Sequence, residues 1–424
     1  MDFPKMIKVN QKLSELSVGD IPSEIRKQLL SIRIDQKVKS GESVAITVGS
    51  RGIRNIDVIT KAVVAYLHEL GVRPFVVPAM GSHGGATANG QKDVLAHYGV
   101  TEETVGAPVK ATMEVLEIGK TEDNITVYMD MYAAKADHVL VMNRVKPHTD
   151  FNGDIESGLH KIMAIGLGKH KGAQYYHQAA VTHGLDRIIY TVGQTMLMEG
   201  NILCGLGIVE NGHDETAILK GMLPEQFEES EKTLLKQSKK MFAALPFDDI
   251  DVLIIDQIGK NISGTGMDTN VVGRLMSIYS PDPELPRIKR IVVSDLTPET
   301  YGNALGIGAA DFCNSRIIDK LDKKAMYTNA ITGLCPEKAR LPMAFSSDKE
   351  MLEAALKTIG FIAPEQAKVV HIKTTLYLEY LELSTAFEEE IRKRDDLIII
   401  RGPEDIQFDT NDNFVFITGN QILI

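Results

Sequence analysis

Cysteine is scarce in this sequence, and its three cysteines, Cys204, Cys313 and Cys335, lie far apart. An odd number of widely spaced thiols forms neither a disulfide framework nor a CxxC metal site. Such usage is typical of proteins from a reducing compartment. We therefore expect a cytoplasmic protein.

Long apolar runs are missing as well. No stretch reaches the roughly 20 apolar residues that a membrane helix needs, and the first residues, MDFPKMIKVNQKLSEL, contain no apolar signal-peptide core. Positive charge is also in deficit, because the formal net charge at pH 7 is -11. An acidic chain lacks the basic face that neutralises nucleic-acid phosphates. We expect neither a membrane nor a nucleic acid as a partner, and a small molecule instead.

Buried-strand patterns alternate with helical patterns along the first half of the chain. Apolar runs at 43–50, 74–80 and 138–145 alternate with helix-like periodicity at 56–70, 91–98 and 185–199. This alternation predicts an α/β domain with a largely parallel sheet.

The same pattern restarts near residues 245–251, which indicates a second domain. We predict an N-terminal α/β domain over residues 1–245 and a smaller α/β domain over residues 246–396, with a cleft between them. The last strands, in residues 397–424, either complete the second domain or rejoin the first.

Histidine, lysine and glycine concentrate in residues 146–183, where five of the eleven histidines lie. A packed core has no use for so many imidazole and ammonium groups. Most of the stretch follows neither the helical nor the strand period, so we interpret it as a site-forming loop system.

Polar side chains follow the ends of four predicted strands. They are Arg51, His83 in the loop GSHGG, His148 after Pro147, and the pair Gln257 and Lys260 in the second domain. Ligands of open α/β sheets bind beyond the carboxyl ends of the strands, so we expect these residues to line one site. Taken singly, each also fits an exposed turn. The glycine-rich loops match neither the P-loop nor the dinucleotide-binding pattern.

As an ordered set, these positions resemble the nickel-dependent lactate racemase family. The set comprises Arg51 in GSRGI, His83, Pro147-His148, Lys161, His177 sixteen residues further on, and Gln257 with Lys260. The resemblance implies an isomerase that racemises or epimerises a 2-hydroxy acid. It also implies a nickel pincer nucleotide as cofactor, which dedicated biosynthesis proteins supply, and it is compatible with a homo-oligomer.

The resemblance assigns a role to each position. Lys161 would carry the cofactor covalently, and His177 would be a nickel ligand. His83 and His148 would act as acid and base, while Arg51 orients the substrate. Gln257 and Lys260 would bind its carboxylate.

Three departures from the lactate enzymes argue for another substrate. Gly158-Leu159-His160 stands where those enzymes carry Gly-Gly-Arg, and tryptophan is absent. The loop before it is polar, with Asp150, Asn152, Asp154 and Glu156. We expect a dicarboxylic 2-hydroxy acid or a sugar acid.

Two alternatives stay open at this point. A zinc- or other metal-dependent hydrolase or lyase would use His148, His160, His170 and His177, although these are widely spaced and form no HExxH motif. A non-catalytic relative would bind an acid or a nucleotide. The roles of His160 and His170 are not assigned.

Overall fold

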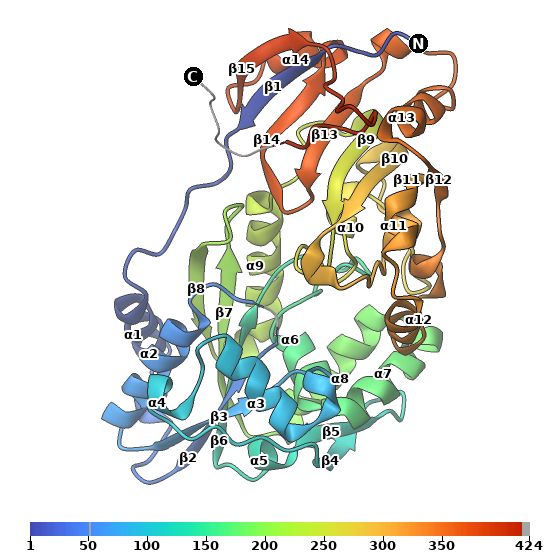
Figure 1. Cartoon of the computed structure of the whole chain (residues 1–424). Helices are drawn as coiled ribbons and strands as arrows, with labels where there is room; N and C mark the ends of the chain where they lie inside the picture. The colour runs from blue at the N-terminus through green and yellow to red at the C-terminus, as the bar shows by residue number, and fades with distance from the viewer. Residues whose placement is uncertain (51, 418–424) are drawn as a thin grey trace. The chain divides into compact units, whose positions relative to one another are not determined.

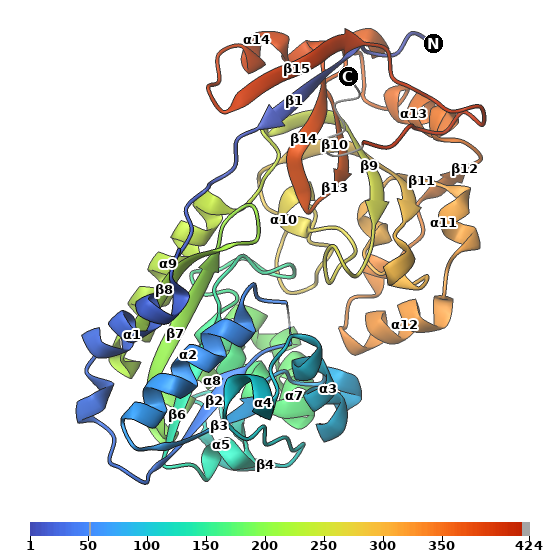
Figure 2. The ribbon, with the colours of Figure 1, turned by 60° about the vertical axis from the view of Figure 1, so that its left-hand side comes forward.

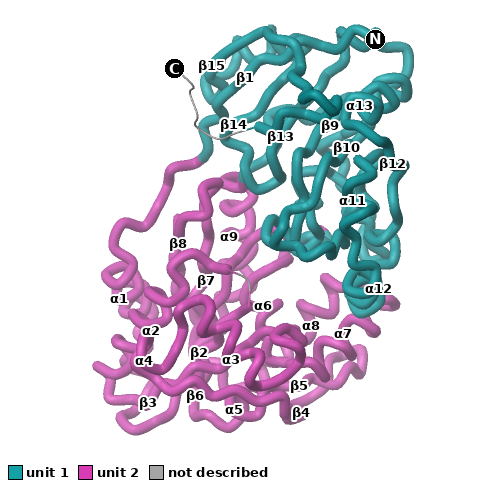
Figure 3. The backbone as a smooth tube through the Cα atoms, in the orientation of Figure 1, with its two compact units in different colours: residues 1–13, 149–151, 243–424 teal, residues 14–148, 152–242 magenta. Residues whose placement is uncertain are grey.

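The computed structural model describes residues 1–50 and 52–417, so Arg51 lies outside the described residues. The chain divides into two compact units (Figure 3). Unit 1 comprises residues 1–13, 149–151 and the chain from residue 243 onward, and unit 2 comprises residues 14–148 and 152–242. Both are α/β units, as predicted.

Unit 2 is built on a five-stranded sheet with the order β3-β2-β6-β7-β8. The strands are β2 (Ser43–Val48), β3 (Arg73–Pro78), β6 (His138–Arg144), β7 (Ile202–Glu210) and β8 (Thr216–Met222). The first four in this order are parallel, and β8 runs antiparallel to β7. A separate hairpin joins β4 (Val115–Lys120) to β5 (Thr126–Asp130). The parallel strands are nearly continuous apolar runs because they are buried on both faces.

Helices accompany this sheet (Figure 1). They are α1 (Ile21–Ser31), α2 (Ile56–Glu69), α3 (Ala88–His97), α4 (Glu102–Val105), α5 (Met131–Ala134), α6 (Leu159–Lys161), α7 (Lys169–His183), α8 (Leu185–Glu199) and α9 (Phe227–Met241). Asp20 caps α1 by accepting from Ser23 N, and Pro22 fits the first turn, where no N–H is needed. The apolar faces of α1 and α2 share one core with β2 and β7.

Unit 1 is built on an eight-stranded sheet with the order β12-β11-β10-β9-β13-β14-β1-β15. Its strands are β1 (Met6–Gln11), β9 (Asp249–Ile258), β10 (Arg287–Leu296), β11 (Phe312–Asn314), β12 (Met343–Phe345), β13 (Val369–Thr374), β14 (Tyr377–Ser384) and β15 (Leu397–Glu404). Its helices are α10 (Thr269–Val272), α11 (Ser315–Asp319), α12 (Lys323–Thr332), α13 (Asp348–Leu356) and α14 (Glu388–Ile391). The first five strands in this order are parallel, and the other three are antiparallel. No helix within residues 1–50 and 52–417 is long and apolar enough to cross a membrane.

The units differ from the predicted domains at the N-terminus. Strand β1 lies between β14 and β15 in unit 1 (Figure 2), whereas the sequence placed residues 1–245 in one domain. Strand β15 accordingly completes unit 1 and does not rejoin the N-terminal sheet. Local patterning cannot show this pairing, because the partners of β1 lie almost a whole chain length away. The later transition, between residues 242 and 243, lies close to the predicted boundary.

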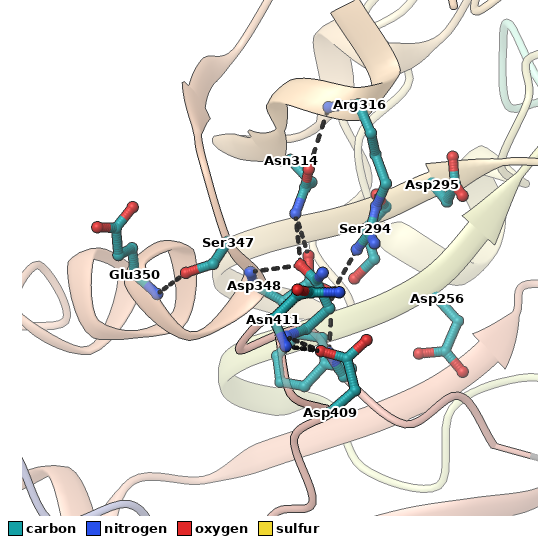
Figure 4. A network of polar contacts seen from close by, with 12 residues as sticks. Asp256, Ser294, Asp295, Asn314, Arg316, Ser347, Asp348, Glu350, Asp409 and Asn411 are labelled. Atoms are coloured by element: carbon teal, nitrogen blue, oxygen red, sulfur yellow. Dashed lines mark hydrogen bonds and ion pairs between the residues drawn. The ribbon is translucent and has the colours of Figure 1, made fainter.

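Residues 414–419 form no regular strand in their described part, which makes one isolated bridge between Phe414 and Phe408. Two carboxylates accept the backbone N–H groups of this segment, as the carbonyls of a neighbouring strand would do. Asp348 accepts from Phe414 N at 3.0 Å, and Asp256 accepts from Ile417 N at 2.8 Å. Asp348 is itself held by Asn314 and Arg316 (Figure 4).

Candidate active site

The parallel strands β2, β3 and β6 bring polar residues to one edge of the unit 2 sheet. Ser50 follows β2, His83 follows β3 and His148 follows β6. The Oγ atom of Ser50 is hydrogen-bonded to Nδ1 of His83. Tyr98 OH donates to the carbonyl of Ser50 at 3.1 Å, which fixes the end of β2. The imidazole of His83 is therefore held through its Nδ1 side.

Glycines allow the His83 loop to take its path. Gly84 has φ +67°, and a Cβ atom there would lie 2.6 Å from Gln91 N. Gly81 also has positive φ, and its N–H donates to Gly166 O at 3.3 Å. Only glycine adopts such conformations at low cost while the backbone approaches so closely.

A buried lysine connects the His83 loop to the segment that follows Lys161. The Nζ atom of Lys169 donates to Gln91 Oε1 at 2.6 Å and to Pro78 O at 2.7 Å. Gln91 in turn donates to Gly81 O at 2.9 Å and to His83 O at 3.2 Å. Sequence reasoning missed Gln91 as a site residue, because nothing in its local pattern separates it from a surface glutamine.

Lys169 also forms a buried ion pair with Asp130, at 3.3 Å. Burial lowers the pKa of Lys169 and raises the pKa of Asp130, and their mutual attraction opposes both shifts. Asp130 caps α5 by accepting from the backbone N–H groups of Tyr132 and Ala133. The pair therefore anchors the start of α7 to the neighbouring hairpin.

The acidic loop before Lys161 holds the backbone of His148. Glu156 is fully buried, and its Oε2 accepts from His148 N at 2.7 Å. Its Oε1 accepts from Gly153 N at 3.1 Å and from Lys239 Nζ at 2.6 Å. Asp154, by contrast, is 82% exposed and lies 3.6 Å from Lys232. Glu156 therefore stabilises its own loop through these hydrogen bonds. The sequence did not indicate this structural role.

The side chains of Lys161 and His148 meet. Lys161 Nζ lies 2.6 Å from His148 Nε2, and His148 is buried while Lys161 is half-buried. Lys161 ends α6, and residues 162–167 continue as a π-helix, a form that occurs frequently at functional sites.

The predicted loop system is therefore wrong for residues 159–183, which are almost entirely helical through α7. Glycines and the buried Lys169 interrupt the apolar stripe, so the helical period was hidden. A Cβ atom at Gly172 would lie 3.0 Å from the ring of Tyr176. Glycine thus marks close packing at this position.

His177 lies on α7 with its ring orientation fixed by the helix. Its Nδ1 lies 2.6 Å from Ala173 O. Because a carbonyl oxygen only accepts, Nδ1 is the donor, and in the neutral ring the lone pair then lies on Nε2. A backbone carbonyl on one ring nitrogen is the usual way in which proteins orient a metal-binding histidine.

His160, in contrast, is enclosed in the unit 2 core. Its Nδ1 lies 2.7 Å from Glu231 Oε2, and both side chains are fully buried. The ring stacks on Tyr190 with 5.8 Å between centroids. A Cβ atom at Gly158 would lie 2.1 Å from Glu231 Oε1, so the glycine makes room for the pair. This histidine has a structural role.

Unit 1 contains the two remaining predicted residues. Gln257 lies in β9, and Lys260 follows it, with its Nζ donating to Gly264 O at 2.6 Å. The three residues 149–151 also belong to unit 1. Thr269 Oγ1 donates to Thr149 O at 2.9 Å, and the buried Lys338 forms an ion pair with Asp150. The sequence predicts that the residues of both domains line one cleft, and this stays a prediction.

Comparison with known proteins matches residues 7–187 to the family described as the lactate racemase N-terminal domain. This part of the chain is therefore similar to the N-terminal domain of lactate racemases. The lactate racemase apoprotein from Thermoanaerobacterium thermosaccharolyticum has a similar fold, with a TM-score of 0.51 at 10% sequence identity. The alignment covers 85% of this chain and 92% of that one. No curated protein matches significantly.

His177 is the predicted metal ligand, and the orientation of its ring by the Ala173 carbonyl fits a residue that would hold a metal cofactor through one imidazole nitrogen. Among the described residues, no group of three or more His, Cys, Asp or Glu side chains is placed to hold a metal ion. Of the four histidines in the zinc alternative, His160 is enclosed against Glu231 and His170 is exposed.

Proposed function

We propose that this protein is a racemase or epimerase of a 2-hydroxy acid. The observation that carries the proposal is the pairing of His148 with Lys161 beyond β6, on the same sheet edge as His83. The lactate racemase family supports a racemase or epimerase in general terms.

The proposed chemistry follows from the acidity of the substrate. The C2–H bond of a 2-hydroxy acid is barely acidic when the neighbouring carboxylate is ionised. Removal of hydride, with transfer of the hydroxyl proton to a base, gives a planar 2-oxo acid, and return to the opposite face inverts the centre. Imidazole suits the proton transfer because its pKa lies near neutrality. His83 and His148 each serve one enantiomer.

The proposed cofactor is a nickel pincer nucleotide, which supplies the hydride acceptor when bound. Lys161 would attach it, and His177 Nε2 would complete the coordination of nickel. The hydrogen bond that orients the His177 ring and the contact between Lys161 and His148 support this assignment. Proteins that synthesise the cofactor are the implied partners.

The proposed substrate is a dicarboxylic 2-hydroxy acid or a sugar acid. Arg51, Gln257 and Lys260 are the proposed groups for its carboxylate, since cations and amides match carboxylate geometry. The absence of tryptophan and the sequence Gly158-Leu159-His160 support a substrate other than lactate. Glu156 gives no such support, because its carboxylate is engaged within its own loop.

The test is production of the protein together with the cofactor-synthesis enzymes, followed by nickel analysis and a panel of 2-hydroxy acids. We expect one nickel per chain and exchange of the C2 hydrogen in a dicarboxylic or sugar acid. Lys161→Arg keeps the positive charge but cannot form the linkage, so it is the matched control. A nickel-loaded protein that binds acids but exchanges no C2 hydrogen would instead be a binding protein. Turnover of lactate alone would overturn the substrate assignment.

A further inference from the structure

Strand β15 lies at one edge of the unit 1 sheet, beside β1 (Figure 2). Its residues Ile398, Ile399 and Ile400 are 45%, 38% and 42% exposed. Successive side chains of a strand point to opposite faces, so this edge exposes apolar surface on both faces. Natural proteins usually protect an edge strand with charged residues, proline or a bulge. In β15, Pro403 and the register irregularity lie beyond Ile399, so the first residues of the strand have no such protection.

The backbone of β15 uses only one of its two sides for pairing with β1. Lys12 N donates to Asp396 O at 2.8 Å, and the register is regular from there to Ile399. In an antiparallel pair, residues bonded to the neighbouring strand alternate with residues whose N–H and C=O groups point away. Asp396 is bonded toward β1, so these groups of Leu397 and Ile399 point to the outer side. Within residues 1–50 and 52–417, no strand pairs with that side.

The other outer strands of the two large sheets are short or covered. Strand β12 has only three residues. The N–H and C=O groups of Val76 in β3 are bonded to residues 108–110. At β8, the side chain of Gln28 accepts from Gly221 N at 3.1 Å. Residues 397–399 of β15 have no such cover in the described part of the chain, which indicates that another strand pairs there.

We propose that β15 pairs in antiparallel fashion with β15 of a second copy of this chain, about a two-fold axis at Ile398. This axis places Leu397 opposite Ile399 of the second copy, and Ile399 opposite its Leu397. Both residues have outward N–H and C=O groups, so each pair exchanges two hydrogen bonds. The same surface serves on both copies, as a closed dimer requires. The proposal does not depend on the proposed function.

Charges beside the isoleucines complement each other in this arrangement. The axis brings the exposed Asp395 of one copy to Arg401 of the second copy. Within its own chain, Arg401 contacts Glu404 at 3.0 Å as an exposed pair, with 63% of the arginine side chain accessible. Exposed pairs of this kind contribute little, so the guanidinium is able to bind a second carboxylate.

The neighbouring registers are unfavourable. An axis at Ile400 would place Asp395 opposite Asp405 of the second copy, and an axis at Asp396 would place that residue opposite itself. Like charges directly opposite each other destabilise a strand pair. The sequence of β15 and its flanks therefore selects the axis at Ile398.

The first experiment measures the mass of the full chain by sedimentation velocity over a series of protein concentrations. We expect twice the chain mass for the parent and a monomer for Ile399→Lys. Leu116→Lys is the matched control, because Leu116 is also 38% exposed and lies in β4 of unit 2. Asp395→Arg should weaken the dimer roughly tenfold, since two like-charged pairs replace two opposite ones. Arg401→Asp in the same chain should restore it.

The second experiment tests the position of the axis by oxidative cross-linking. At the axis, Ile398 lies opposite its own copy in a non-hydrogen-bonded pair, with Cα atoms about 4.5 Å apart. Ile398→Cys should therefore form a disulfide between two chains. Ile400→Cys is the control, because four residues along a strand, or about 13 Å, would separate the two copies of that residue. The parent, with its own three cysteines, gives the background.

A monomeric parent overturns the proposal. A dimer that persists unchanged in Ile399→Lys forms through another surface and overturns it as well. Circular dichroism checks that the lysine variant is folded. The cross-link keeps the proposal falsifiable if that variant does not fold, because equal disulfide yields for Ile398→Cys and Ile400→Cys would refute the axis.

Discussion

Lys169 Nζ donates to Gln91 Oε1 at 2.6 Å in the interior of unit 2, where both side chains are fully buried. Gln91 belongs to α3 and Lys169 to α7. Each side chain is also hydrogen-bonded to the backbone, at His83 O for Gln91 and at Pro78 O for Lys169. Gln91 supports the His83 loop, and Lys169 begins the helix that carries His177. The contact therefore links the proposed acid/base residue to the proposed cofactor ligand.

Replacement of Gln91 by leucine should weaken both the fold and the site. The change removes an amide that bonds Gly81 O, His83 O and Lys169, so polar groups lose their partners. We expect a loss of about 1–3 kcal/mol in the free energy of unfolding, measured by urea denaturation, with a fall in turnover of loaded enzyme. Gln36→Leu, at an exposed position, should change neither. Unaltered turnover in folded Gln91→Leu would contradict the link.

Removal of one partner of the His160–Glu231 pair should be more costly than removal of both. Glu231→Leu leaves His160 buried without its carboxylate, which we expect to cost about 3–5 kcal/mol. Combining it with His160→Leu should recover part of this loss, because an apolar pair has no desolvation penalty. A double-mutant cycle in urea measures the coupling. Additive losses would show that the pair is not coupled.

Lys338→Met should destabilise unit 1. The lysine is 1% exposed and pairs with Asp150, so the substitution removes a largely buried ion pair. We expect a cost of about 3 kcal/mol and faster proteolysis in residues 149–151. The surface pair Lys349–Asp412, at 3.2 Å, is the matched comparison. Lys349→Met should cost less than about 1 kcal/mol. Equal costs for the two variants would refute the distinction.

His371 should make unit 1 less stable as the pH rises above neutrality. Burial alone lowers its pKa, but Asp256 at 2.6 Å and Glu382 at 3.4 Å outweigh burial and raise the pKa to about 10. A raised folded pKa stabilises fully below the unfolded value of 6.5, and this stabilisation is lost as the pH rises toward 10. Each pKa unit corresponds to about 1.4 kcal/mol.

Urea unfolding across that pH range measures the loss. In Asp256→Asn the closer of the two carboxylates is neutralised, so we expect a lower stability near neutrality and a flatter dependence on pH. The parent and the variant share every other titrating group, so their difference isolates this pair. Parallel pH profiles would show that Asp256 does not set the charge of His371.

Sequence reasoning located His83 and His148 correctly at strand ends, because apolar runs show where parallel strands stop. It misjudged residues 159–183, where glycines and a buried lysine hide the helical period. It also had no means to place Glu231 or Gln91 beside histidines, since each looks like the polar residue of a surface helix. Such pairs are created by tertiary packing. The roles of Lys161, His177, Gln257 and Lys260 stay predictions.

The position of β1 between β14 and β15 affects the order in which the two units can fold during translation. Strand β1 leaves the ribosome first, yet its neighbours β14 and β15 are among the last strands to emerge. All of unit 2 lies between them in the sequence, so its residues are translated long before the final strands. Domains generally fold as units during translation. In a nascent chain that has been translated through unit 2, this unit should therefore already resist protease. Strand β1 stays unpaired until β14 and β15 have been translated.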